Sequence, residues 1–582
     1  MLALAGVAFA LGAILGSGHS GSPAYALADG FVKAWARGDY ASMYSDIDAA
    51  SQRDVSASSF ASTYRHALIT ATATGVRVTG RPRSAGGGFV AVPVRVRTRL
   101  FGSLALSFAV KTVHDAEGIR VAWSRSLAFP GLRSGERLAR RTTLPRRATL
   151  LARDGSVLAE SSRGSGGTAS AEAARSSPLG SIATAVLGTV GPVPASRRRA
   201  LEAQGVPPDA AVGLTGLERT LDDRLRGTAG GALLATGVQP GVGRVLAYAT
   251  PRPAPPLHTT VSPALQRAAV IALGGQLGGI VAMRPSTGQI LAVAGIGLNG
   301  LQPPGSTFKM VTLTGVLQAG IASPRSTFPY ASFATLDGVR LNNANGENCG
   351  GSLELAFAVS CNSVFAPLGV KLGSQRLLDT AERFGFNHDP GIEGAPESTL
   401  PAASQIQGEL AIGSTAIGQG QVLATPLQML IVAATIADGG RRPRPAVVLA
   451  GAHAAAGRVM SAAVARTVRR LMTGVVRSGT GTSAAIPGVV VAGKTGTAEL
   501  KTACSSAASE SPPAEAGEAG GEHCRGGASD PSNTDAWFAA FAPAIHPRIA
   551  VCVMLVKDGA GGATAAPVAR QVLEAGLQAG SG

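Results

Sequence analysis

Three short stretches of this sequence carry side chains that could catalyse acyl transfer. The first is GSTFK, in which Ser306 stands three residues before Lys309. If a helix begins at the serine, the two side chains lie on one face, one turn apart. Burial and neighbouring cations lower the pKa of a lysine, so its amine could take the proton from a nucleophilic hydroxyl. A Ser-x-x-Lys pattern alone also occurs by chance on protein surfaces, so this interpretation needs partners.

The second stretch is SCN, which places Ser360 and Asn362 on either side of Cys361 within the apolar segment LELAFAVSCNSVFAPLG. Polar residues that interrupt a helical apolar pattern indicate a turn that faces a cleft. An ordinary polar turn between two helices is the alternative interpretation of this stretch when it is taken alone.

The third stretch, GVVVAGKTGTAEL, fits two different motifs. From Gly488 to Thr495 it matches the phosphate-binding P-loop, and from Lys494 to Gly496 it matches the Lys-Thr-Gly box of serine acyl-transfer enzymes. A P-loop needs a left-handed backbone that valines disfavour, followed by a helix, whereas these valines predict a strand. Ser-x-x-Lys, Ser-x-Asn and Lys-Thr-Gly follow one another along the chain, and their joint occurrence in this order favours an acyl-transfer enzyme over a P-loop protein.

The elements that must position these residues fall into several predicted domains. Residues 23–132 begin with a helical pattern anchored by Phe31, Trp35 and Tyr40 and continue as alternating strands. Residues 133–255 contain a hairpin turned at Asp154-Gly155 and a helix in GLERTLDDRLRG.

Residues 256–582 are predicted to form a third domain, in which strands from both ends surround inserted helices, an α+β arrangement. Ser262 is expected to cap a helix in this domain. The low-complexity stretch 501–533 is expected to be a flexible insert.

Charge and cysteine content limit the classes of partner and ligand that the sequence predicts. The net charge is +17, and the arginine-rich run from Arg133 to Arg147 could face an anionic lipid or polymer, or could be an ordinary solvated basic surface. No aromatic stacking series accompanies this run, so nucleic acid is not predicted as a partner. The cysteine spacings fit no metal site; Cys504 and Cys524 could form a disulfide, and Cys552 is predicted to be an inert buried strand residue.

The N-terminal residues 1–22 are predicted to be a truncated membrane anchor or a signal segment. They contain an apolar run that is slightly shorter than a usual spanning helix and is followed by the linker-like GSGHSGSP.

The combined motifs resemble the class B penicillin-binding proteins, the monofunctional D,D-transpeptidases of peptidoglycan synthesis. GSTFK, SCN and GKTGTAE resemble the three boxes of that family, and RDGSVLA and GLERTLDDRLRG resemble its non-catalytic pedestal. AIGQGQVLATPLQM, where Thr425 and Pro426 start a helix, resembles the segment behind the site. The resemblance implies a multidomain α+β protein with an NTF2-like domain, a β-rich pedestal or dimerisation domain, and a transpeptidase domain similar to serine β-lactamases, with an antiparallel sheet flanked by helices.

The same resemblance implies a role for each residue of the boxes. Ser306 would be the acylated nucleophile and Lys309 its base, while Ser360 would relay a proton to the leaving D-alanine. Asn362 would bind the substrate amide and the base, and Lys494 would add positive potential. The substrate-binding residues would be Thr495, Gly496 and Thr497, and the N–H groups of Ser306 and Thr497 would form the oxyanion hole.

The implied partners are peptidoglycan stem peptides, β-lactams and a membrane glycosyltransferase, with no metal or organic cofactor. The catalytic domain would lie on the extracytoplasmic side of the plasma membrane. A serine β-lactamase is the first alternative, with Glu393 and Glu397 as candidates for activating water, although the large N-terminal pedestal argues against it. A catalytically idle β-lactam-binding scaffold or sensor is the second alternative.

Overall fold

The computed structural model of the chain describes residues 22–116, 118–161, 175–237, 243–449, 456–499 and 533–579. The chain forms two compact units, and each unit is assembled from separate stretches of sequence. One unit contains the residues up to Arg146 together with Pro192–Ala210 and Arg226–Pro253, and the other contains Arg147–Gly191, Ala211–Leu225 and the residues from Ala254 onwards.

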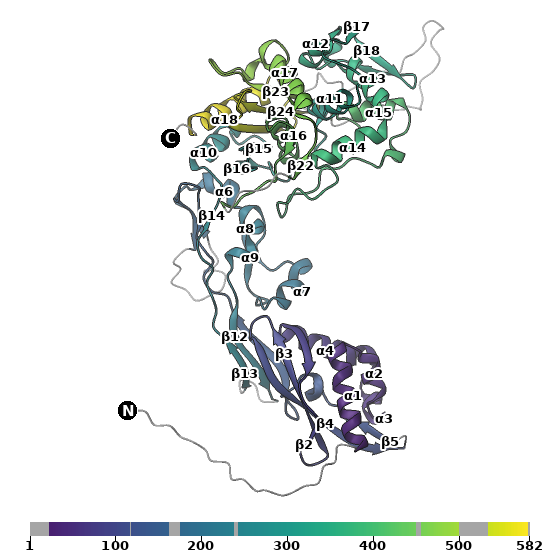
Figure 1. The fold of residues 1–582 in the computed structure, drawn as a ribbon. Coiled ribbons are helices and arrows are strands. Elements are labelled where there is room, and N and C mark those ends of the chain that lie inside the picture. Colours follow the sequence, from purple (N-terminus) through teal and green to yellow (C-terminus); the bar gives the residue numbers. More distant parts are fainter. Residues whose placement is uncertain are drawn as a thin grey trace, which may run out of the picture. The chain divides into compact units, whose positions relative to one another are not determined.

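The first unit begins with helices that pack against one face of an antiparallel sheet (Figure 1). Val90, Val92, Val94 and Val96 alternate along one strand and bury their side chains on the same face, as a period of two residues requires. The predicted anchors Phe31 and Trp35 are buried, and Tyr40 is half-buried. The helices are α1 (Pro23–Arg37), α2 (Tyr40–Ser45), α3 (Ala49–Asp54) and α4 (Ala57–Thr70), and the strands are β1 (Ala73–Val78), β2 (Arg83–Ser84), β3 (Phe89–Thr98), β4 (Ser103–Asp115) and β5 (Gly118–Val121).

A second sheet in this unit has the order β13-β12-β6. Arg140, from the arginine-rich run, lies in β6 and donates hydrogen bonds to the carbonyl oxygens of Ile69, Thr70 and Glu202 at 2.9–3.1 Å. This part of the run is therefore structural. The elements are η1 (Arg125–Ala128), β6 (Arg137–Thr143), α7 (Ala195–Ala203), β12 (Gly230–Thr236) and β13 (Gly243–Ala249).

The second unit starts with small sheets and short helices. The predicted hairpin is confirmed: β7 and β8 pair antiparallel, and Gly155 adopts a φ of 82° between them. The single helix expected in GLERTLDDRLRG is instead two short helices, α8 and α9. The elements are β7 (Leu150–Leu151), β8 (Val157–Ser161), β9 (Arg175–Ser176), α6 (Ser181–Leu187), β10 (Val190–Pro192), β11 (Ala211–Gly213), α8 (Gly216–Thr220), α9 (Asp222–Leu225) and β14 (Leu257–His258).

Arg147, the last residue of the arginine-rich run, is buried in the second unit by these helices. It forms ion pairs with Glu218 at 2.6 Å and with Asp222 at 2.8 Å. A surface role is therefore wrong for this arginine as well, because its charge is neutralised in the interior.

The rest of the second unit is built on an antiparallel sheet with the order β16-β15-β25-β24-β23. The outer strands come from opposite ends of this region, as predicted. One face of the sheet packs against α10 and α18, and the other contributes to the larger core with α11, α16 and α17. The elements are α10 (Pro263–Leu273), β15 (Gly278–Met283), β16 (Ile290–Gly295), α11 (Lys309–Gln318), α16 (Pro426–Ala437), α17 (Ala462–Ser478), β23 (Ala492–Glu499), β24 (Thr534–Ala542), β25 (Ile549–Leu555) and α18 (Ala565–Ala579).

Two predicted helix caps are present in this region. The Ser262 side chain accepts a hydrogen bond from the Leu265 N–H at the start of α10, and Thr425 does the same for Gln428 at the start of α16. Cys552 is fully buried in β25, as predicted, and burial raises the pKa of its thiol.

Further elements complete this region (Figure 1). They are η2 (Gly305–Phe308), β17 (Thr327–Ala331), β18 (Phe333–Leu336), β19 (Val339–Asn342), η3 (Ala344–Gly346), β20 (Cys349–Ser352), α12 (Leu353–Ala358), α13 (Asn362–Leu372), α14 (Ser374–Phe384), η4 (Ala403–Gln405), α15 (Glu409–Ala416), β21 (Arg441–Arg442), β22 (Gly457–Arg458) and η5 (Thr482–Ala484).

Several predictions fall outside the described residues. These are the N-terminal segment, apart from Ser22, and the Cys504–Cys524 pairing within the insert. Within the described ranges, no helix combines the length and the apolar character needed to cross a membrane.

Candidate active site

Ser306 lies in the 3-10 turn η2, immediately before α11, and is partly exposed. Gly305 fixes this turn: its N–H donates to the Gly418 carbonyl at 2.9 Å and its φ is +51°. A Cβ atom at this position would lie 2.6 Å from the Thr497 carbonyl oxygen. The glycine therefore allows the serine turn to pack directly against β23.

Lys309 is the first residue of α11 and has no exposed surface. Its Nζ donates hydrogen bonds to the Ser360 carbonyl at 2.6 Å, to Asn362 Oδ1 at 2.6 Å and to Ser360 Oγ at 3.3 Å. Burial, followed by the charge of Lys494, holds the pKa of Lys309 well below its usual value. The amine is therefore prepared to accept a proton.

Ser360 occupies the turn between α12 and α13 with a φ of +62°, an uncommon conformation for a residue with a side chain. The Cys361 N–H donates to the Ala356 carbonyl at 2.8 Å and closes this turn. The Ser360 hydroxyl consequently lies between two amines, 2.9 Å from Lys494 Nζ and 3.3 Å from Lys309 Nζ. A hydroxyl in this position can pass a proton between its neighbours.

Asn362 begins α13 and has a fixed amide orientation. Its Nδ2 donates to the Asn342 carbonyl at 2.8 Å, which turns Oδ1 toward the Lys309 amine. The SCN stretch is therefore the predicted turn, and both of its polar side chains face the buried lysine.

The Lys-Thr-Gly residues lie on the edge strand β23. Lys494 is fully buried, and burial lowers its pKa to about 7. Thr495 Oγ1 lies 2.6 Å from Thr480 Oγ1, and Thr497 Oγ1 accepts a hydrogen bond from the Gly561 N–H at 3.4 Å. Gly496 faces the serine turn, because a Cβ atom there would lie 2.8 Å from the Pro304 carbonyl.

The valines before this box do not form the strand that the sequence predicts. β23 starts at Ala492, and Val489 makes only an isolated bridge to Ile486 across a turn at Gly488. The P-loop interpretation is nevertheless excluded, because Lys494 lies in a strand and not at the start of a helix.

The structure thus brings Lys309, Ser360, Asn362 and Lys494 into one hydrogen-bonded cluster beside the Ser306 turn. In the described part of the chain, Ser306 makes no hydrogen bond to Lys309. Such catalytic contacts are often long without substrate and tighten when it binds.

The two glutamates considered for a β-lactamase lie on the surface. Glu393 is exposed and forms an ion pair with Arg219 at 3.8 Å, and Glu397 is also exposed. Neither side chain makes a hydrogen bond to the boxes among the described residues.

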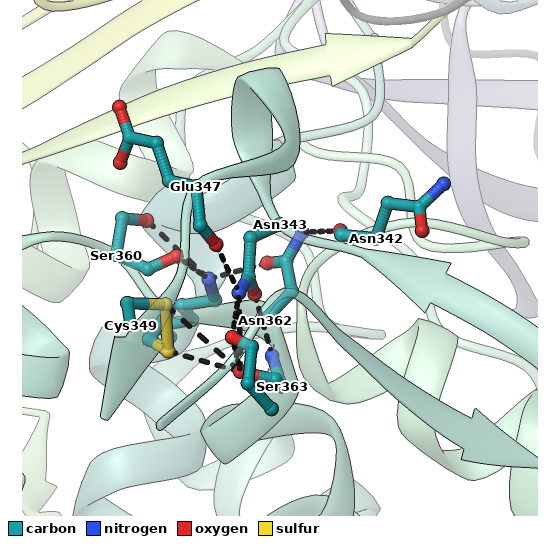
Figure 2. The surroundings of a disulfide bond; sticks show 10 residues. Asn342, Asn343, Glu347, Cys349, Ser360, Asn362 and Ser363 are labelled. Atoms are coloured by element: carbon teal, nitrogen blue, oxygen red, sulfur yellow. Dashed lines mark hydrogen bonds between the residues drawn. A yellow bond between two sulfur atoms is a disulfide. The ribbon is translucent and has the colours of Figure 1, made fainter. Parts of the chain in front are cut away.

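Sequence reasoning missed a disulfide that ties the second box to β20. Cys361 pairs with Cys349 of β20, and Figure 2 shows this bond beside Asn343, Asn362 and Ser363. Thr480, which contacts Thr495, and Asn343 were also missed. The cysteines offered a signal, since both flank the same apolar segment, but a spacing alone does not establish pairing.

Comparisons with known families cover most of the chain. Residues 278–574 match the penicillin-binding protein transpeptidase domain, residues 160–250 the penicillin-binding protein dimerisation domain, and residues 23–136 the NTF2-like N-terminal transpeptidase domain.

Individual relatives agree with the family matches. The chain is 34% identical to the peptidoglycan D,D-transpeptidase PbpA of Mycolicibacterium smegmatis over 63% of its own length and 80% of that protein. It resembles the D,D-transpeptidase domain of a peptidoglycan glycosyltransferase from Eggerthella lenta, with a TM-score of 0.57 and 28% identity over 75% of this chain and 99% of that one.

A third similar structure is an acyl-enzyme complex. It is penicillin-binding protein A of Mycobacterium tuberculosis with penicillin G, with a TM-score of 0.56 and 27% identity over 74% of this chain and 100% of that one. With the three boxes and their supporting domains in place, this chain belongs to the penicillin-binding protein transpeptidases, as a class B member with an NTF2-like N-terminal domain.

Proposed function

We propose that this protein is a serine-type peptidoglycan D,D-transpeptidase that cross-links stem peptides through an acyl-enzyme and is acylated by β-lactams. One observation carries the proposal. The Ser360 hydroxyl lies within 3.3 Å of two buried lysine amines, next to the turn that presents Ser306. Such a group can take a proton from a nucleophile and deliver it to a leaving amine.

In the first step, Ser306 Oγ attacks the carbonyl carbon of the penultimate D-alanine. The Lys309 amine takes the hydroxyl proton, and the backbone N–H groups of Ser306 and Thr497 stabilise the oxyanion. The peptide bond breaks, Ser360 passes a proton to the leaving nitrogen, and free D-alanine departs. The products are a Ser306 ester and the released amino acid.

In the second step, an amine of a neighbouring stem peptide attacks the ester carbonyl. Its proton returns to the lysine–serine relay, Ser306 recovers its hydroxyl proton, and a new amide bond remains. Asn362 holds the Lys309 amine and the substrate amide through both steps. No step of this sequence requires a metal or an organic cofactor.

The donor carboxylate is proposed to lie against Thr495, Gly496 and Thr497. The hydroxyls of the two threonines can donate to it, and Gly496 keeps the strand close to the serine turn. A bound carboxylate favours the charged form of Lys494, so substrate binding would restore the positive potential that burial removes.

Two relatives support the same reaction for this chain. The PbpA protein is a named D,D-transpeptidase, and penicillin-binding protein A forms an acyl-enzyme with penicillin G. A β-lactamase would need a residue that activates water, and the exposed positions of Glu393 and Glu397 do not favour one.

The test is a reaction of purified protein with a donor peptide ending in D-Ala-D-Ala and an amine acceptor. We expect released D-alanine and a cross-linked product, both lost in Ser306→Ala. A matched control is Ser404→Ala, which removes an exposed serine of η4 and should leave the reaction unchanged. Rapid turnover of penicillin without cross-linking would favour the β-lactamase, and cross-linking by Ser306→Ala in cells would favour the scaffold.

We also propose that the catalytic domain acts on the extracytoplasmic side of the plasma membrane, beside a membrane glycosyltransferase. The apolar N-terminal run of the sequence and the anchoring that it implies support this location. Protease accessibility in intact spheroplasts would test it, and protection of the whole chain would contradict it.

A further inference from the structure

Asn343 is a buried amide whose hydrogen-bonding groups are all occupied. Its Nδ2 donates to the Ala331 carbonyl at 2.7 Å and the Glu347 carbonyl at 2.8 Å, with Ser363 Oγ at 3.2 Å. Its Oδ1 accepts from the Ser363 N–H at 2.8 Å. Figure 2 shows Asn343 pointing into this cluster behind the second box. Fully satisfied buried networks of this kind fix a single arrangement of the segments that they join.

One of these bonds caps α13 from outside the helix. The helix begins at Asn362, and the side chain of the preceding Cys361 makes no capping bond. The first N–H groups of a helix have no partner inside it, and an unpaired buried donor is costly. Asn343 Oδ1 supplies the partner for the Ser363 N–H, so a residue from the segment after β19 sets the position of the first turn of α13.

The preceding residue acts on the catalytic amide directly. The Asn342 carbonyl accepts the hydrogen bond from Asn362 Nδ2 at 2.8 Å. This bond decides which end of the Asn362 amide faces Lys309, since an inverted amide would place an NH₂ group against the amine. The backbone of residues 342–343 therefore touches both the catalytic amide and the helix that carries it.

We propose that Asn343 is a positioning residue for acyl transfer. It holds the Asn342 carbonyl and the first turn of α13 in register, and through them it orients Asn362 and Ser360 around the Lys309 amine. The inference rests on the proposed function, and it assigns to the reaction a residue that lies outside the three boxes and does not touch substrate.

Because a disulfide already attaches the second box to β20, the role proposed for Asn343 is to orient the start of α13. Cys361 ties the second box to β20, and its Sγ lies 3.1 Å from Ser363 Oγ. The cross-link joins the two segments at one point. The four polar contacts of Asn343 add a second connection, which includes the backbone of Ala331, Glu347 and Ser363.

The test compares penicillin acylation of Asn343→Ala with that of the wild type, separating the acylation rate constant from the noncovalent affinity. We expect the rate constant to fall about 10- to 100-fold, because small displacements of catalytic groups cost rate on this scale. The noncovalent affinity should fall much less than the rate constant, since Asn362 contributes one amide contact to binding whereas Thr495 and Thr497, which hold the carboxylate, are not displaced.

The control is Gln266→Ala, which removes a second buried amide. Gln266 Nε2 donates to the carbonyls of Ile182 and Val293, and its Oε1 accepts from the Val293 N–H, away from the boxes. This variant should lose stability but keep the acylation rate constant of its folded fraction. An equal loss of rate in both variants, or none in Asn343→Ala, would overturn the proposal.

Asn343→Asp keeps the acceptor for the Ser363 N–H and the volume of the side chain, so it tests the proposal if the alanine variant does not fold. Its rate constant should lie between those of the wild type and the alanine variant, and a wild-type rate would contradict the role of the Nδ2 contacts. If the wild type and Gln266→Ala both fail to acylate, the proposed function fails and not only this inference.

Discussion

At the scale of single residues, the site depends on two lysines that the fold keeps away from water. Lys309 and Lys494 are both fully buried, and both contact the Ser360 hydroxyl. A charged amine is disfavoured in such surroundings, so burial supplies the base that the chemistry needs.

The coupling between the two amines leads to a pH prediction. Because the charge of Lys494 lowers the pKa of Lys309, Lys494→Met should raise it. The acylation rate rises with pH as Lys309 loses its proton, so the rising limb of the profile should move to higher pH in the variant. Acylation rates measured over a range of pH give the midpoint of the rising limb separately from the maximal rate. A limb that stays in place or moves to lower pH would contradict this coupling.

The residues of the boxes could be predicted from the sequence because each motif is local. Ser306 and Lys309 are separated by three positions, and Lys494 to Thr497 are consecutive. Asn343 and Thr480 could not be predicted, since their partners Ser363 and Thr495 are distant in the chain. Only the packing of the elements brings such pairs together.

At the scale of elements, the candidate site depends on the direct packing of η2 on β23. Gly496 has no room for a side chain: a Cβ atom would lie 2.8 Å from the Pro304 carbonyl and 3.0 Å from Thr307 Cγ2. This close approach keeps the serine turn next to the edge strand.

Gly496→Ala should therefore lose both stability and activity. Overpacking typically costs about 1–3 kcal/mol of the free energy of unfolding, and the displaced turn should slow acylation. Chemical denaturation and penicillin labelling measure the two effects. Gly30→Ala is the control, because Gly30 lies within α1 and has nothing within 4 Å of the added atom. Equal behaviour of the two variants would contradict the packing argument.

The disulfide in the second box leads to a separate prediction. Replacing Cys349 and Cys361 by serine removes a cross-link with a sequence separation of 12. Loops of about 15 residues give roughly 3 kcal/mol in the chain-entropy description, so the free energy of unfolding should fall by an amount of this order. Acylation should also slow, because the Ser360 turn loses its tie to β20.

Reductant provides the check on that variant. Cys504 and Cys524 remain in it, so the effect of reductant is measured on both proteins. Reductant should lower the free energy of unfolding of the wild type by more than that of the variant, because only the wild type contains the Cys349–Cys361 disulfide. An equal response of both proteins would contradict the assignment.

Helix caps and turns could be predicted from the sequence where the residues nearby in the chain favour a single local structure. The caps at Ser262 and Thr425 and the hairpin at Asp154-Gly155 follow from side chains that bond within a few residues. The strand at the valines of residues 489–491 was misplaced because β propensity says nothing about available partners. β24 pairs with β23 only from Ala492 onwards.

At the scale of the whole molecule, the chain has separate hydrophobic cores in its two units. Phe31, Trp35 and Phe108 belong to the core of the first unit, and Phe308 and Trp537 to the largest core of the second. The residues of the candidate active site all belong to the second unit.

Calorimetry should therefore resolve two unfolding transitions, and acylation by penicillin should raise the temperature of only one. A group bound to one folded unit stabilises that unit alone when the two unfold independently. The unreacted Ser306→Ala variant, treated in the same way, should show no shift. A single transition that moves as a whole would contradict independent units.

The division into two units could not be predicted from the sequence, because each unit combines segments that are separated along the chain. After the chain has entered the second unit, it returns to the first unit twice, with Pro192–Ala210 and with Arg226–Pro253. Composition indicates loops and hydrophobic periodicity indicates helices and strands, but neither shows which distant segments share a hydrophobic core.

The most direct measurement of the central claim is intact-mass analysis after penicillin treatment, followed by peptide mapping. We expect the wild type to gain the mass of one penicillin, on the peptide that contains Ser306, and Ser306→Ala to gain none. A wild type without an adduct, or an adduct that persists in Ser306→Ala, would contradict the account.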